Sequence, residues 1–385
     1  MTQFIQLHLL TSYPPSNLNR DDLGRPKTAI MGGLPRLRIS SQSLKRAWRE
    51  SSVMETAVHA EHIGIRTKRM GGYLLDALIE GVSLVQLLEN ETSKTSGLSK
   101  VREPVSIELA KAWSRLIAEC FGDVEGKSKK ETIDPRDKIK EEIQLKQLAH
   151  FNNAEIQALE KVLNQIANEK MEPSFSKEEA KERFLFHAHT AVDVAMFGRM
   201  LASAVAYNSE AAVQVAHAIT VHPMEPDQDF FTAVDDLNKR EDDAGAGHLG
   251  VSEFGAGLFY LYICIDKDLL IRNLNNNEEL ASRAIVALCE AAATVAPSGK
   301  QNSFASRARA SYLLAEKGNQ QPRSLSVAFL KRLTSDDILS QSIAAITQTK
   351  ENFDKVYGPC ADESRSMNVL TGEGNLSDVL KFITI

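Results

Sequence analysis

The chain of 385 residues lacks most features that mark membrane-embedded, metal-binding or nucleotide-hydrolysing proteins. Its longest apolar run, Phe254–Ile265, is too short to span a bilayer. Neither GxxxxGK[ST] nor GxGxxG occurs, which disfavours a mononucleotide pocket. The N-terminus has no basic region before its apolar stretch, so we expect no signal peptide and a cytoplasmic protein. The cysteines form no CxxC pair and are expected to be small buried residues: Cys120, Cys264, Cys289 and Cys360.

Acidic residues outnumber basic ones overall, but positive charge is concentrated in one stretch. The chain has a net charge of −6, with 43% hydrophobic and 25% charged residues, as in soluble globular proteins. Its length predicts one large domain with insertions, or two domains. Residues 16–49 contain eight Lys or Arg against two Asp, so the remaining positions carry a net charge of −12. Because local fields attract polyanions, this basic stretch is the main indication of function.

Hydrophobic periodicity predicts strands and helices in irregular alternation, which favours an α+β fold over a doubly wound sheet. His8, on the polar face of the first expected strand, is more typical of a structural residue than of a catalytic one. The segment Phe184–Asn208 is expected to return to the main sheet, and His222–Gly250 is a long Pro/Asp/Gly-rich loop of the functional or disordered kind. Strands are expected at Phe4–Leu10, Arg36–Ile39 and Val251–Ile265, and helices at about Gln42–Ser51, Tyr73–Leu88, Ser106–Cys120, Lys138–Phe151, Asn153–Ala167, Ser209–Ala218 and Glu278–Val295.

The helix that begins near Ser41 combines an expected cap with a basic stripe. Ser40 and Ser41 offer an N-cap. The spacing i, i+3, i+4, i+7 places four polar residues on one face, and Leu44, Ala47 and Trp48 on the opposite face. A helix N-terminus with basic side chains suits a phosphate, although a solvated amphipathic helix has the same pattern. The polar residues are Gln42, Lys45, Arg46 and Arg49.

The loop before this helix favours the phosphate interpretation. If the loop folds back, several of its donors lie near the helix start, and glycines permit close approach of the backbone to a phosphate. Asp21 and Asp22 could bind a metal, but we expect them to orient the neighbouring arginines. The loop donors are Asn19, Arg20, Lys27, Gly32, Gly33, Arg36 and Arg38. An extended polyanion backbone is therefore the expected ligand.

Several motifs resemble the CasC family, the repeated backbone subunit of the type I-E CRISPR Cascade complex in the RAMP superfamily. The SSQSLKR element is specific in this context, whereas the middle helical region and the last hundred residues match more loosely. The matching motifs are LNRDD (18–22), K-x-A-x-x-GG (27–33), R-x-R-I-S-S-Q-S-L-K-R (36–46), GRM (198–200), HAIT (217–220), FFTAVDDL (230–237) and HLG (248–250).

The resemblance implies an α+β fold shaped like a hand. Residues 1–55, 181–221 and 251–385 would form an RRM-like (ferredoxin-like) palm, 56–180 a helical finger insertion, and 222–250 a β-hairpin thumb. Copies would polymerise head to tail along CRISPR RNA beside other Cascade subunits. Each thumb would displace one base at regular intervals, so that the guide can pair with target DNA in antiviral defence. No enzymatic activity, cofactor, metal or membrane contact is implied.

Carried over residue by residue, the resemblance divides the expected RNA-binding residues into three groups. Met200 and Leu249 would wedge beside the displaced base, while Phe230, Phe231 and Val234 would shape the thumb. The run Arg66–Arg69 and the pair Lys300–Gln301 are secondary candidates. Residues that would grip the RNA backbone are Arg20, Lys27, Ser40, Gln42, Lys45, Arg46 and Arg49.

Two alternatives remain open from the sequence. Backbone subunits of related type III complexes cut RNA with a metal held by a loop aspartate. Asp21, Asp22, Asp235 and Asp236 could form such a centre here, since paired carboxylates hold divalent ions. In the other alternative, the basic stripe meets an acidic protein surface instead of RNA.

Overall fold

The computed structural model describes residues 3–90, 97–126, 134–174, 176–187, 191–201, 203–233, 248–334 and 336–384. It is a mixed α/β fold with one large antiparallel sheet and many helices. Its contacts divide the chain into two compact units. Unit 1 comprises Met1–Val58, Val213–Ile271 and Asn277–Ile385, and unit 2 comprises His59–Ala212 and Arg272–Asn276.

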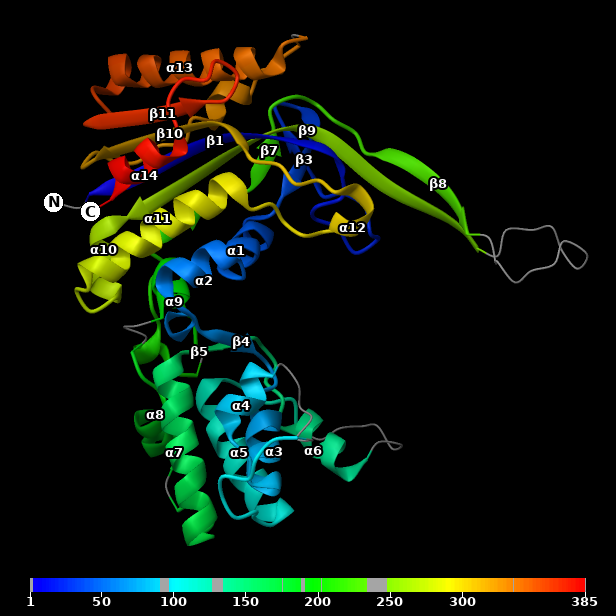
Figure 1. The fold of residues 1–385 in the computed structure, drawn as a ribbon, viewed down its shortest axis with the longest axis vertical. Coiled ribbons are helices and arrows are strands. Elements are labelled where there is room, and N and C mark those ends of the chain that lie inside the picture. Colours follow the sequence, from blue (N-terminus) through cyan, green and yellow to red (C-terminus); the bar gives the residue numbers. More distant parts are fainter. Residues whose placement is uncertain are drawn as a thin grey trace, which may run out of the picture. The chain divides into compact units, whose positions relative to one another are not determined.

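Unit 1 is built on an antiparallel sheet of strand order β11-β10-β1-β9-β7-β3-β2, with β6 and β8 also paired to β9 (Figure 1). The central strand β1 is buried on both faces, because Leu7 and Leu9 point to one side and His8 and Leu10 to the other. The strands are β1 (Phe4–Ser16), β2 (Thr28–Met31), β3 (Leu34–Ile39), β6 (Val213–Val215), β7 (Ala218–Thr220), β8 (Asp227–Ala233), β9 (His248–Asp266), β10 (Ala310–Gly318) and β11 (Glu363–Asn368).

Helices cover both faces of this sheet (Figure 1). On one face, α11 (Glu278–Thr294) contacts β1 and β10 and packs against α1, α2 and α14. On the other face, α13 (Ile338–Tyr357) and η3 (Ser326–Phe329) enclose an apolar cluster that includes Leu10 and Tyr260. The remaining helices of this unit are α1 (Ser41–Arg49), α2 (Ser52–Val58), α12 (Gln301–Phe304) and α14 (Leu376–Ile383), and α10 (Lys267–Asn273) follows β9.

A buried polar network crosses the sheet at His8, which is structural as expected. Its ring nitrogens lie 2.9 Å from the Tyr260 hydroxyl and 3.2 Å from Glu316 Oε2. Burial lowers the pKa of His8. Burial alone would raise the pKa of Glu316, but hydrogen bonds from His8 and Arg323 lower it to about 2. Arg323 donates to both Glu316 oxygens, at 2.5 and 3.0 Å, which anchors the segment before η3 to the sheet.

Unit 2 is largely helical, with a small β4–β5 pair. Phe121 and Phe151 lie at its core with ring centroids 4.2 Å apart. A capping box between Asn152 and Glu155 starts the longest helix of this unit. Its elements are η1 (Ala60–His62), β4 (Ile65–Thr67), α3 (Met70–Glu80), α4 (Leu84–Glu89), α5 (Ile107–Phe121), α6 (Pro135–Glu142), β5 (Ala149–Phe151), α7 (Asn153–Glu169), α8 (Lys177–Phe184), α9 (Val192–Phe197) and η2 (Val205–Tyr207).

Several sequence-based expectations about these elements are wrong. The helix expected over Tyr73–Leu88 is divided into α3 and α4, because Gly81, with a φ of 71°, ends α3. The loop expected over His222–Gly250 contains β8 and the start of β9. The helix expected over Lys138–Phe151 ends at Glu142, and β5 follows it. The segment expected to return to the sheet contains α9 and η2 instead, and no strand lies among its described residues. The expected helix over Ser209–Ala218 is replaced by β6 and the start of β7, because both strands pair with β9 and that pairing overrides local propensity.

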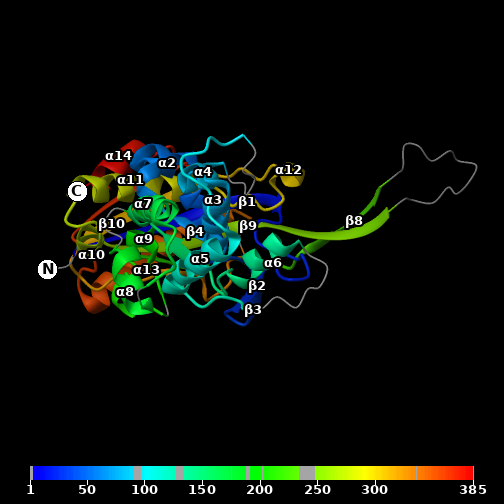
Figure 2. The ribbon, with the colours of Figure 1, turned by 90° about the horizontal axis from the view of Figure 1, so that it is seen from below.

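Strands β8 and β9 continue beyond the other strands of unit 1 as a two-stranded ribbon (Figure 2). Their antiparallel register runs from Asp227 opposite Phe254 to Ala233 opposite His248. Residues 234–247, between the two strands, lie outside the described residues. In the described part of the chain, no helix is long and apolar enough to cross a membrane.

Candidate functional site

The start of α1 is hydrogen-bonded to the loop that precedes β2. The Ser40 side chain caps α1 by accepting from the Ser43 N–H at 3.4 Å. The Ser40 N–H donates to Asn19 Oδ1 at 2.8 Å. The Lys27 N–H donates to the Asn19 carbonyl, and the Arg38 N–H to the Lys27 carbonyl. These bonds bring Asn19, Lys27, Arg38 and Ser40 to one place, which we call the α1 corner together with Ser41 and His217.

His217, on the turn between β6 and β7, completes this corner. Its Nδ1 accepts the Ser41 N–H at 3.0 Å and lies 3.5 Å from an Arg38 guanidinium nitrogen. Burial, followed by the charges of Arg38 and Lys27, lowers the pKa of His217. The ring is therefore a neutral acceptor at pH 7 in a positively charged environment. His217 belongs to the HAIT motif, but no local sequence signal indicates that it meets α1.

The α1 helix presents the predicted basic stripe. Leu44 and Trp48 are buried, whereas Gln42 and Arg46 are exposed. Burial lowers the pKa of Lys45. The first turn of α1 contains no acidic residue. The positive end of the helix dipole favours an anion at the first turn, whereas Arg46 and Arg49 lie in the last turn, so the basic side chains extend the positive surface along the helix.

Glu50, the C-cap residue of α1, partly neutralises the end of this stripe. It accepts from Arg46 Nε at 3.1 Å and from Arg49 Nη2 at 3.3 Å. Both contacts are near the surface, and such pairs contribute little stability. A phosphate can therefore compete with Glu50 for the two guanidinium groups.

Arg36 does not belong to this surface, contrary to expectation. Its side chain is fully buried and donates to the carbonyls of Thr220 and Phe329, at 3.2 and 3.1 Å. Arg36 therefore ties β3 to β7 and η3. Sequence reasoning missed this because its partners lie 184 and 293 positions away.

Asp21 has the predicted orienting role. One carboxylate oxygen accepts the backbone N–H groups of Leu23 and Arg25, and the other accepts Arg25 Nε at 3.1 Å. Hydrogen bonds, first of all from the Arg25 backbone, lower the pKa of Asp21. Arg20 is exposed in the same loop. Asp21 is thus engaged in holding the loop turn.

The β8–β9 ribbon has one exposed apolar face. Directly opposed residues in an antiparallel pair share a face, and Phe230 is opposite Val251. These side chains are 64% and 61% exposed. Leu249 is opposite Thr232 and takes a register position on the same face. Sequence reasoning missed Val251, although the alternation of Leu249 and Val251 along the strand is a signal that could have identified it.

Phe231 lies on the other face of the ribbon, where its ring covers Gly250. A Cβ at Gly250 would lie 2.4 Å from the ring. Phe230 and Phe231 were grouped by sequence reasoning, but their different faces give them different surroundings. Val234, the remaining candidate of this segment, lies outside the described residues.

Met200 belongs to unit 2 and is 81% exposed, so it is not a core residue. The preceding Arg199 is buried and pairs with Glu155 at 2.9 Å. Arg199 also donates to the carbonyls of Phe186 and Tyr207. A buried ion pair therefore fixes the backbone from which Met200 projects into solvent.

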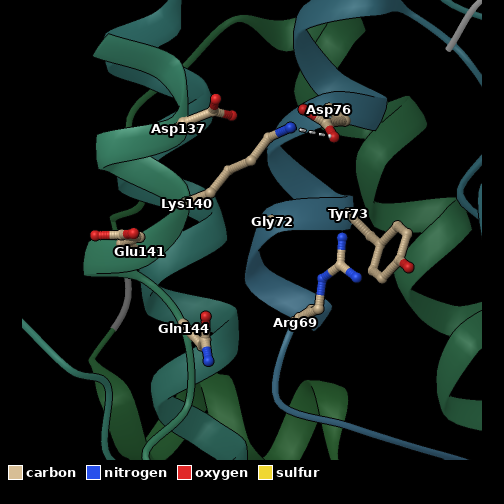
Figure 3. A pocket seen from close by; sticks show the side chains of 8 residues that line it. All are labelled: Arg69, Gly72, Tyr73, Asp76, Asp137, Lys140, Glu141 and Gln144. Carbon is tan, nitrogen blue, oxygen red and sulfur yellow. Dashed lines mark ion pairs between the residues drawn. The ribbon is translucent and has the colours of Figure 1, made fainter. Parts of the chain in front are cut away.

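Unit 2 also contains a cavity of about 320 Å³ between α3 and α6 (Figure 3). Asp76, fully buried on one wall, pairs with Lys140 and with Arg136, both at 2.8 Å. The Arg69 guanidinium lies 5.5 Å from the centre of the Tyr73 ring. The acids among the lining residues outnumber the bases, so the cavity does not suit a polyanion. The lining residues are Arg69, Gly72, Tyr73, Asp76, Asp137, Lys140, Glu141 and Gln144.

Comparisons with known proteins show what the chain is similar to. The model of a family described as CT1975-like protein matches residues 5–380. One similar solved structure is a chain of a "CRISPR RNA-guided surveillance complex, pre-nicking", with 27% identity, a TM-score of 0.75, and coverage of 97% of this chain and 94% of that chain. Another, from a "CRISPR RNA-guided surveillance complex", has 24% identity, a TM-score of 0.56, and coverage of 97% and 92%, and shows the fold alone. No curated protein matches the chain.

Proposed function

The chain belongs to the CT1975-like protein family, and from this premise we propose that it is a non-catalytic backbone subunit that polymerises along CRISPR RNA. The family match and the similarity to chains of surveillance complexes confirm the resemblance to the CasC family. Such a subunit must accept any guide sequence, so it should bind phosphates and sugars rather than base edges. The guide then supplies sequence specificity by pairing with target DNA.

The α1 corner is the observation that carries this proposal. Backbone N–H groups, the Ser40 cap, Lys27 and Arg38 are held together by hydrogen bonds, and Lys45 and Arg46 follow on the same helix. These bonds fix the backbone that carries the cationic side chains, which then offer their charges to a phosphate backbone, and no pocket that selects a base lies among the described residues of the corner. A single-stranded RNA, with Arg20, Gln42 and Arg49 as further contacts, is the ligand that fits it.

The exposed apolar face of the ribbon supports the second part of the proposal. Phe230 and Val251 are large side chains that nothing covers among the described residues. With Leu249 and Met200, they would wedge into the RNA and displace one base per subunit, at a cost of about a few kcal/mol per unstacked step. Apolar wedges have no base preference, which suits a scaffold for variable guides.

These roles correspond to the parts of a hand. We assign residues 222–250 to a thumb that reaches the RNA of the neighbouring copy, 56–180 to the finger insertion, and 1–55, 181–221 and 251–385 to an RRM-like palm, although residues 181–212 pack within unit 2. Head-to-tail copies, other Cascade subunits and target DNA are the proposed partners, in the cytoplasm. No cofactor is assigned.

The salt dependence of RNA binding tests the proposal. In the full-length protein, Lys45→Ala/Arg46→Ala should weaken binding of unrelated single-stranded RNAs alike and lower the slope of log K against log salt by about 0.7 per lost contact. Lys355→Ala/Lys381→Ala is the matched control, because both lysines are exposed on the distant helices α13 and α14. An unchanged slope in the first variant would reject phosphate contact at α1.

The two alternatives predict different results. A metal-dependent nuclease would cleave complementary RNA with Mg²⁺ and lose this activity in Asp→Asn variants. Asp21 already binds Arg25, the described residues contain no cluster of three metal-ligating side chains, and Asp235 and Asp236 lie outside those residues. A protein-only assembly subunit would copurify without RNA, whereas our proposal predicts RNA of uniform length and excess absorbance at 260 nm.

A further inference from the structure

The base of the ribbon is joined to the loop that carries Arg20. Asn17 is fully buried, and its amide donates to the carbonyls of Gly24 at 3.0 Å and Glu253 at 2.8 Å. The Ser16 hydroxyl donates to the Gly255 carbonyl at 3.4 Å. One buried asparagine therefore fixes the end of β1, the following loop and the base of β9 as one support.

The turn that leads into α12 packs on the same support. A Cβ at Gly299 would lie 2.4 Å from the Leu18 carbonyl oxygen, so only glycine allows this approach. The ring of Phe304, at the end of α12, lies 5.8 Å from that of Phe254 on the ribbon. Gly299 and Leu18, which are almost 300 positions apart in the sequence, thus meet. Leu18 lies within three residues of Arg20 along the chain.

The backbone of this turn is held in conformations that side chains rarely adopt. Lys300 and Ala305, on either side of α12, both have a φ of 47°. Such left-handed residues persist only where the surrounding structure compels them, and they concentrate at functional sites. Gln301 between them accepts from the Ser306 hydroxyl at 3.2 Å. The turn is therefore fixed rather than adaptable.

Two arginines follow the turn and indicate which kind of ligand this surface binds. Arg307 and Arg309 are exposed and lie just before β10, whose first residue is opposite Thr11. Neither guanidinium forms an ion pair with another described residue. Residues 291–315 contain Lys300, Arg307 and Arg309 but no acidic residue, in a chain with more acids than bases. The family resemblance indicated Lys300 and Gln301 as secondary candidates but not these arginines.

We propose that Arg307 and Arg309, with Lys300, bind phosphates of the same RNA that the α1 corner grips. The inference rests on the proposed function. It extends the proposed RNA-binding surface from the α1 corner, past Asn17, to the base of the ribbon. Guanidinium groups suit this task, since each can donate two parallel hydrogen bonds to a phosphate. Because the support around Asn17 is rigid, the fold sets the distance between Arg20 and the cationic group formed by Lys300, Arg307 and Arg309.

The test compares five full-length proteins with one unstructured single-stranded RNA: wild type, Arg307→Ala/Arg309→Ala, Arg307→Lys/Arg309→Lys, Lys45→Ala/Arg46→Ala, and the Lys355→Ala/Lys381→Ala control. Affinity is measured at several salt concentrations. The new variant should lower the salt slope by about 1.4, from two lost phosphate contacts on a single strand, while the control keeps the wild-type slope. Arg307→Lys/Arg309→Lys should keep most of the slope, because it keeps the charge.

The outcomes separate this inference from the function on which it rests. An unchanged slope in the Arg307/Arg309 variant, with a reduced slope in the Lys45/Arg46 variant, overturns the inference alone. Unchanged slopes in both variants overturn the inference and the proposed function together. If the Arg307/Arg309 variant keeps its RNA affinity but no longer assembles with other copies, these arginines meet an acidic protein surface and the inference is wrong. Arg307→Gln/Arg309→Gln replaces the alanine variant if circular dichroism shows that the latter is unfolded.

Discussion

The α1 corner and the β8–β9 ribbon offer opposite surfaces to a ligand. At the corner, backbone N–H groups have partners within the chain: that of Ser40 donates to Asn19, and that of Ser41 to His217. On the ribbon, Phe230 and Val251 stand in solvent with no polar partner. The bonds at the corner therefore belong to the fold itself, whereas the exposed face of the ribbon adds little to stability.

This difference suits a division of the two proposed roles, in which the corner would grip the RNA and the ribbon would displace a base. A grip needs donors fixed in space, and hydrogen bonds fix them. A wedge needs apolar bulk and reach, which an exposed ribbon supplies at little cost to folding. Substitutions should accordingly affect stability strongly around the corner and hardly at all on the ribbon.

The largest expected effect is at Arg36, beneath the corner. Arg36→Ala removes two hydrogen bonds to carbonyls and leaves a cavity, so the free energy of unfolding should fall by about 2–4 kcal/mol. Arg36→Met fills the volume without donating hydrogen bonds and should lose less. Chemical denaturation measures both variants. Arg46→Ala, an exposed arginine, is the control and should stay within about 0.5 kcal/mol of wild type. Equal stability of the Arg36 and Arg46 alanine variants would contradict the structural role of Arg36.

Arg36 and Arg46 also show where sequence reasoning succeeds. The α1 helix, with its Ser40 cap, buried Leu44 and Trp48 and exposed Arg46, was predicted because capping and periodicity are local. The sequence pattern does not distinguish Arg36 from Arg38, its neighbour on β3. Only the contacts with Thr220 and Phe329 do so, and these depend on how the sheet is assembled.

The dependence on contacts between distant segments also explains the other differences between the predicted and the observed structure. Val213–Val215 and Ala218–Thr220 are too short for periodicity to identify, and β9 makes them strands. The meeting of Gly299 with Leu18 joins two turns that no local pattern connects. The basic stripe, the capped helix and the aromatic pair of the ribbon were visible in the sequence. The roles of His217, Val251 and the Arg307–Arg309 pair required the fold.

A smaller effect is expected from the pH dependence of the corner. The folded-state pKa of His217 is lowered by burial, Arg38 and Lys27. As the pH falls below about 6.5, the unfolded chain binds the proton first. The stability that neutral His217 contributes is therefore complete above that pH and is lost below it. His217→Gln keeps an acceptor for the Ser41 N–H and should reduce the difference in unfolding free energy between pH 7.5 and 5.5.

His59→Asn is the control for this pH effect, since His59 is exposed and belongs to unit 2 rather than to the α1 corner. It should leave the pH difference as in wild type. If His217→Gln also leaves it unchanged, the ring is not held neutral by its surroundings, and the corner is less positive than its geometry indicates.

The smallest effect on stability, but a large effect on function, is expected from the ribbon. Phe230→Ser/Val251→Ser should change the free energy of unfolding by less than about 0.5 kcal/mol, because both side chains are already exposed. The same variant should blur the periodic pattern of exposed bases when the RNA of the assembled complex is probed chemically. The matched control is Gln228→Ser/Glu253→Ser, the opposed polar pair next along the same face, which should leave the pattern intact.

A stability loss of more than about 1 kcal/mol in the Phe230/Val251 variant would mean that these side chains pack against the chain itself. The ribbon would then be a structural element like the corner, and the comparison would fail. An intact RNA pattern with unchanged stability would remove both residues from the wedge. Because the two readouts are independent, only a stable protein with a disturbed RNA pattern is consistent with an exposed apolar face that acts on something outside the chain.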